Sequence, residues 1–156
     1  LNTNIYFRTM YSLILISHIV ISILLILLAI YIVMRSFLGM MGKVNFSKFQ
    51  DINLPIVAVI FLYLELILGV LLYAIYINKL EVLITQANAN AYFSARFWAV
   101  EHAILMLFAI IFGHLGLVYA KNLEDDRQKF KKNFLYFGLS FVLIFISITM
   151  NMFRNA

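Results

Sequence analysis

Four apolar stretches alternate with polar segments along the 156 residues of the chain. The first is an uncharged run from Thr9 to Met34, which lies between Arg8 and Arg35. At about 1.5 Å per residue, a helix of this length is longer than the roughly 30 Å hydrocarbon core of a bilayer. The whole pattern predicts an all-α, integral membrane four-helix bundle in a single transmembrane domain, with spans at about 10–34, 54–78, 97–120 and 133–153.

The segments between these spans are polar enough to lie outside the hydrocarbon. Pro55 stands in the first turn of the second span, where a proline is tolerated. Residues 79–95 mix apolar residues with Gln and Asn, which predicts a short amphipathic segment at the interface. Residues 121–132 carry acidic and basic side chains and are expected to form a charged loop.

Composition agrees with lipid as the main solvent. The chain is 65% hydrophobic and 12% charged, whereas soluble domains average about 45–50% and about 25%. The absence of Cys excludes disulfides, thiolate metal sites, iron–sulfur clusters and c-type haem attachment. Despite a net charge of +5, nucleic acid is not an expected partner, because the basic residues are divided among the loops.

The distribution of Lys and Arg predicts an orientation. The loops after the first and third spans hold eight of them, and the opposite side holds four. By the positive-inside rule, both termini are expected on the extracytoplasmic side of the membrane. The eight are Arg35, Lys43, Lys48, Lys121, Arg127, Lys129, Lys131 and Lys132.

Placing an ionisable side chain inside a membrane costs free energy, so each such residue suggests a functional role. His18 and His102 are on spans that run in the same direction, and both are expected roughly 10 Å below the extracytoplasmic surface. One interpretation is a haem b with these two histidines as axial iron ligands. The other is that both are structural residues that form hydrogen bonds between helices.

Small residues near the two histidines allow close helix packing or a slot for a flat ligand. Gly69 and Ser147 are expected at the same depth as the histidines. Along the two spans, Ala109, Gly113 and Gly116 follow His102, and Ser22 and Ala29 follow His18.

Three further ionisable residues carry weaker hypotheses. Glu65, in the middle of the second span, is expected to be protonated or paired, with a proton-transfer or quinone contact as the functional alternative. Glu101 can pair near the interface or orient an imidazole on another helix. His114 lies about 18 Å along its helix from His102 and is expected to be a hydrogen-bonded packing residue.

Short motifs give the chain a resemblance to a family of short four-span, cytochrome-b-like membrane proteins of Bacteroidota. The resemblance implies a small inner-membrane protein of respiratory electron transfer, with His18 and His102 as the residues to examine. Members of that family often carry an additional histidine in the second span, where this chain has Tyr63 and Glu65. The motifs are Ser17-His18, Leu68-Gly69, Arg96-Phe97, Val100-Glu101-His102 and Lys129-Phe130-Lys131-Lys132.

Two functions are therefore predicted as alternatives. The first is a b-type cytochrome-like subunit that passes electrons between a quinol or partner cofactor and a larger membrane complex. The second is a haem-free accessory subunit of such a complex, whose His and Glu side chains satisfy one another. Under either function, the chain is not expected to be an enzyme on its own. Each function requires other membrane subunits as partners.

Overall fold

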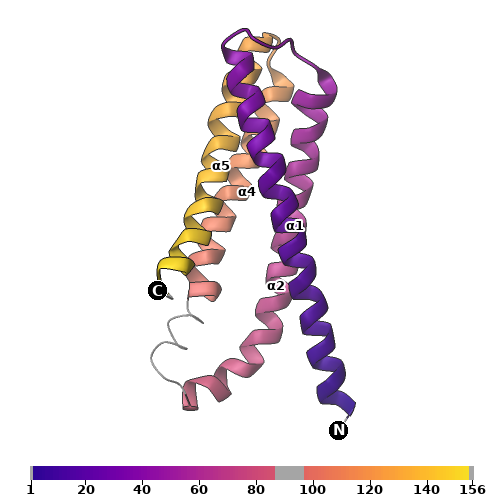
Figure 1. The fold of residues 1–156 in the computed structure, drawn as a ribbon, viewed down its shortest axis with the longest axis vertical. Helices are drawn as coiled ribbons and strands as arrows, with labels where there is room; N and C mark the ends of the chain where they lie inside the picture. The colour runs from indigo at the N-terminus through magenta and orange to yellow at the C-terminus, as the bar shows by residue number, and fades with distance from the viewer. Residues whose placement is uncertain (1, 87–96, 155–156) are drawn as a thin grey trace.

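A computed structural model describes residues 2–86 and 97–154 of the chain, with side chains at 6, 9–75, 98 and 100–150. Within that part, every regular element is helical (Figure 1). Four long helices are present, and a single π-helical turn precedes two of them. The elements are α1 (Asn2–Met40), the π-turn η1 (Phe49–Asn53), α2 (Leu54–Gln86), the π-turn η2 (Phe97–Glu101), α4 (His102–Asn122) and α5 (Asp126–Arg154).

The four helices form an antiparallel bundle. The links from α1 to α2 and from α4 to α5 lie at one end of the molecule, and both chain ends lie toward the other (Figure 1). Helix α1 packs against α2 and α5, and α4 packs against the same two helices. Helices α1 and α4 are therefore diagonal neighbours that run in the same direction. The helices diverge toward the end where the termini lie.

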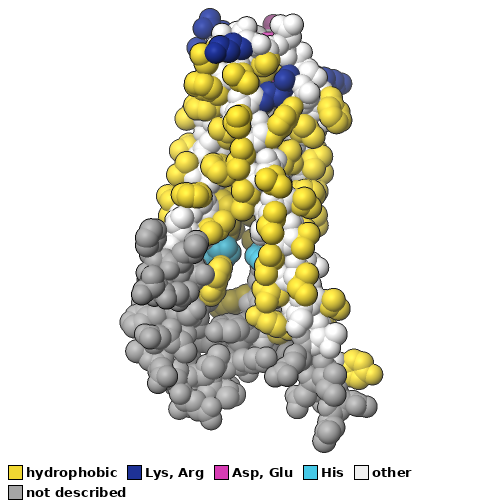
Figure 2. Space-filling model, viewed as in Figure 1, with side chains coloured by type: hydrophobic (Ala, Val, Ile, Leu, Met, Phe, Trp, Pro, Cys, Tyr) yellow, Lys and Arg dark blue, Asp and Glu magenta, His cyan; other side chains and the backbone are white. Residues whose placement is uncertain are grey.

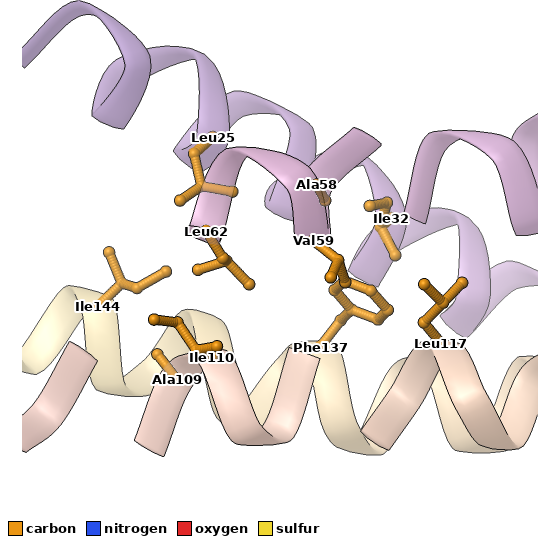
Figure 3. Close-up of a cluster of buried hydrophobic side chains, with 10 residues drawn as sticks. All are labelled: Leu25, Ile32, Ala58, Val59, Leu62, Ala109, Ile110, Leu117, Phe137 and Ile144. Atoms are coloured by element: carbon orange, nitrogen blue, oxygen red, sulfur yellow. The ribbon is translucent and has the colours of Figure 1, made fainter. Parts of the chain in front are cut away.

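Each long helix contributes to one narrow apolar core along the axis of the bundle. Figure 3 shows the side chains that meet there from all four helices. The outward surfaces of the same helices are apolar as well, and Ile23, Ile67, Ile111 and Phe145 are each at least half exposed. All four helices are long and apolar enough to cross a membrane. Hydrophobic side chains cover their sides in Figure 2, and Lys and Arg gather at the end with the two links.

The helices extend beyond the predicted spans. Helix α2 runs on to Gln86, into the segment predicted to lie at the interface; residues 87–96 are outside the described part. Helix α5 begins at Asp126, so most of the expected charged loop is helical. Asp125 explains this start, because its side chain accepts a hydrogen bond from the Arg127 N–H and its carbonyl oxygen accepts one from the Lys129 N–H.

A buried ion pair fixes the link between α1 and α2. Arg35 donates from Nε and Nη2 to the two carboxylate oxygens of Asp51, at 2.8 and 3.0 Å. Asp51 is 3% exposed and also accepts the Ser47 N–H at 2.7 Å. From α5, the Asn133 side chain donates to the Asp51 carbonyl oxygen at 3.0 Å. The link and the start of α5 are thus bound together through η1.

Candidate functional site

His18 and His102 meet inside the bundle, between the diagonal helices α1 and α4. Their ring centroids are 6.4 Å apart, and the ring planes are inclined by 77°. His102 is the first residue of α4 and directly follows the π-turn η2. Single π-turns often occur at functional sites, because the extra residue changes the direction in which nearby side chains point.

Glu65 on α2 is the neighbour of the His18 ring. His18 Nδ1 lies 2.6 Å from Glu65 Oε2, and the two side chains are 18% and 11% exposed. The distance allows an ion pair or a shared proton, although the ring orientation does not satisfy the angle of an ordinary hydrogen bond. Ser22, one turn along α1, donates its hydroxyl to the same Glu65 oxygen at 3.0 Å. Glu65 is therefore paired with α1 through two contacts.

Ser147 on α5 contacts the ring of His102. Its Oγ lies 2.7 Å from His102 Nδ1, and the serine is only 1% exposed. Trp98, in the π-turn, packs its ring against His102 with a centroid separation of 5.0 Å. His102 is thus oriented by one polar contact from α5 and one aromatic contact from η2.

This arrangement has the features of a pair of metal-ligating imidazoles. Ligating histidines commonly engage their second ring nitrogen with a carboxylate or another polar group, which fixes the ring. Glu65 approaches Nδ1 of His18 and Ser147 approaches Nδ1 of His102, so Nε2 is the nitrogen of each ring that could ligate a metal. If an iron were bound here, His18 from α1 and His102 from α4 would hold it, and their centroid separation of 6.4 Å is of the order that two metal–nitrogen bonds of about 2 Å require.

Gly69, beside His18, is less closely packed than the glycines of α4. A methyl group added at Gly69 would meet only the His18 ring, at 4.0 Å. A methyl group at Gly113 would instead approach Leu62 to 2.7 Å, and one at Gly116 would approach the Tyr136 side chain to 2.9 Å. The glycines of α4 therefore serve close helix packing.

The other two candidate residues, Glu101 and His114, stand in different positions relative to this pair. Glu101 is half-buried in the π-turn η2, immediately before His102. His114 lies on the outer face of α4, where its Nδ1 is 3.2 Å from the hydroxyl of Tyr63 on α2. His114 does not join His18 and His102, and no group of three or more metal-ligating side chains occurs in the described part of the chain.

Comparison with known proteins adds nothing to this geometry. No family model matches the chain, and no curated protein or solved structure is significantly similar to it. The resemblance to cytochrome-b-like proteins therefore remains a prediction from short motifs.

Proposed function

We propose that the chain is an integral protein of the bacterial inner membrane that crosses it four times, with both termini on the extracytoplasmic side. Four helices of sufficient length and an apolar surface on every helix support the membrane location. The eight Lys and Arg residues of the sequence segments that follow the first and third spans, against four on the opposite side, support the orientation.

Within that membrane, the proposed function is one-electron transfer through a haem b held by His18 and His102. The observation that carries the proposal is the pair of imidazoles at 6.4 Å on parallel, diagonal helices. When bound, the haem supplies reversible one-electron oxidation and reduction. Glu65 and Ser147 orient the two rings from α2 and α5, and Gly69 leaves room beside His18.

The chain departs in its second span from the family that it resembles, and this departure counts against carrying a haem over from the family. Tyr63 and Glu65 stand in the region where the related proteins often carry their additional histidine. In this chain both contact a histidine of another helix, Tyr63 meeting His114 and Glu65 meeting His18. One haem near one side of the membrane cannot carry electrons across it alone, so further subunits of a membrane complex are expected partners.

The alternative is a haem-free accessory subunit, and one observation favours it. Glu65 and Ser147 provide polar contacts for the two histidines without any ligand. Under this alternative, the cluster stabilises the bundle by about 0.6–2 kcal/mol per contact, as interhelical polar contacts in membranes do. The two proposals differ in whether the purified chain carries haem.

A reduced-minus-oxidised difference spectrum of the full chain, purified in detergent with pyridine haemochrome quantitation, separates them. The cytochrome proposal predicts a b-type α-band at about one haem per chain, lost in His18→Ala and in His102→Ala. His114→Ala is the matched control, because this third histidine lies outside the pair, and it should retain the band. A featureless spectrum from the folded chain, or an α-band that survives in both variants, overturns the haem assignment.

A further inference from the structure

A pocket opens at the end of the bundle that holds the two links, between the end of α1 and the start of α5. Its volume is about 350 Å³, which is within the roughly 300–1,000 Å³ of small-molecule sites. Residues between 39 and 46 line one side of it, and residues between 126 and 130 line the other. Because the candidate spans end at Met40 and begin at Asp126, the proposed membrane location places this pocket among the lipid head groups.

Contacts between the first link and α5 fix the shape of the pocket. The Phe130 ring packs directly on Gly39, so that a methyl group at this glycine would overlap the ring. The Phe46 ring meets Phe130 edge-on, with centroids 5.9 Å apart and ring planes inclined by 67°. Lys129 Nζ lies over the Phe46 ring, 4.3 Å from its centroid. The pocket is therefore built by packed side chains, and two of its lining residues are aromatic.

Two opposite charges line the same pocket, on Asp126 and Arg127 at the start of α5. Lys129 Nζ lies 2.8 Å from Asp126 Oδ1, but the Asp126 side chain is 54% exposed and its carboxylate remains accessible to a second cation. Within the described part of the chain, the exposed Arg127 side chain forms no hydrogen bond or ion pair. A ligand that matches these charges carries both an anionic and a cationic group.

The rest of the lining favours a ligand with an apolar part. The N–H of Gly42 already donates to a carbonyl oxygen of the last turn of α1, at 3.0 Å. Met41 is 52% exposed and adds apolar surface beside the aromatic rings. Charge recognition therefore falls to Asp126 and Arg127, and an amphipathic molecule fits the pocket better than a wholly polar one.

We propose that this pocket binds the head group of phosphatidylethanolamine. The Arg127 guanidinium donates N–H groups to the phosphate oxygens, and the ammonium group of the lipid donates to the Asp126 carboxylate. A phosphatidylcholine head group has the same charges but no N–H donor for Asp126, and phosphatidylglycerol has no cation for it. The inference rests on the proposed membrane location and is independent of the haem.

The test is native mass spectrometry of the full chain in detergent, titrated with these three lipids carrying identical acyl chains. Wild-type protein should bind one phosphatidylethanolamine at least about threefold more tightly than either of the others. Arg127→Gln should weaken binding of all three about three- to tenfold, and Asp126→Asn should remove the preference for ethanolamine. Lys131→Gln and Glu124→Gln are the matched controls, because they make the same charge changes outside the pocket lining, and both should keep the wild-type preference.

A photoreactive phosphatidylethanolamine locates the site. Labelling of the peptides that contain residues 39–46 and 126–130, suppressed by excess unlabelled lipid, supports the proposal. Equal binding of the three lipids, a preference that survives in Asp126→Asn, or labelling elsewhere overturns it. Binding of glycerophosphoethanolamine as tightly as the lipid also overturns it, because the ligand would then be a soluble molecule. Recovery of the chain in the membrane fraction tests the membrane location separately, so a membrane-embedded chain without the ethanolamine preference refutes only the lipid site.

Discussion

The buried ion pair between Arg35 and Asp51 gives the sharpest prediction about stability. Replacing Asp51 with Ala removes two charge-assisted hydrogen bonds from Arg35 and one from the Ser47 N–H. Breaking a buried ion pair from one side costs about 3–5 kcal/mol. The Arg35 side chain is 14% exposed, so water partly rehydrates it in the variant. We therefore expect the free energy of unfolding to fall by about 2–4 kcal/mol.

Unfolding of the purified chain in mixed micelles, titrated with dodecyl sulfate and followed by fluorescence of the lone Trp98, measures this change. Asp126→Ala is the control, since Asp126 forms an ion pair with Lys129 but is 54% exposed, and it should cost no more than about 0.5 kcal/mol. A double-mutant cycle of Arg35→Ala and Asp51→Ala should give a coupling of about 2 kcal/mol. The reasoning is refuted if Asp51→Ala resembles Asp126→Ala or if the coupling is near zero.

Two further predictions use the same purified chain. Gly39→Ala places a methyl group in steric overlap with ring carbons of Phe130 and should lower the free energy of unfolding by about 1–3 kcal/mol. Gly138→Ala places a methyl group with nothing within 4 Å and should raise the free energy of unfolding by up to about 1 kcal/mol. Dodecyl sulfate titration measures both changes. Ser147→Ala removes the contact to His102 Nδ1 and should lower haem affinity about 10-fold or more while leaving some haem bound, as measured by haem titration. An unchanged haem affinity would show that Ser147 does not orient the His102 ring for iron binding.

The sequence predicts the four helices well because each apolar run is long enough to span a bilayer. A helix satisfies the backbone hydrogen bonds of such a run within the run itself. It also places His18 and His102 at similar depth, and they lie together. Depth along a helix follows directly from the rise per residue. The partner of each histidine does not, because it depends on how neighbouring helices rotate about their axes. The sequence therefore singles out Glu65 and Ser147 without assigning either to its histidine.

The contacts at the end of the bundle that holds the two links could not be predicted from the sequence, for a different reason. Asp51 and Asn133 stand in segments whose composition is typical of exposed, solvated residues, yet both are buried and hydrogen-bonded. The π-turns that place Asp51 and His102 have no recognisable sequence signal. The His114 contact with Tyr63 likewise requires two helices to be placed side by side before it becomes visible.

The central claim is that His18 and His102 ligate one iron, and electron paramagnetic resonance of the oxidised, haem-loaded chain tests it most directly. The account predicts a low-spin ferric signal from two imidazole ligands in the wild type, because two strong nitrogen ligands favour that state. It predicts conversion to a high-spin signal, or loss of haem, in both His18→Ala and His102→Ala. A low-spin signal that survives in either variant, or a folded wild-type chain that takes up no haem, would contradict it.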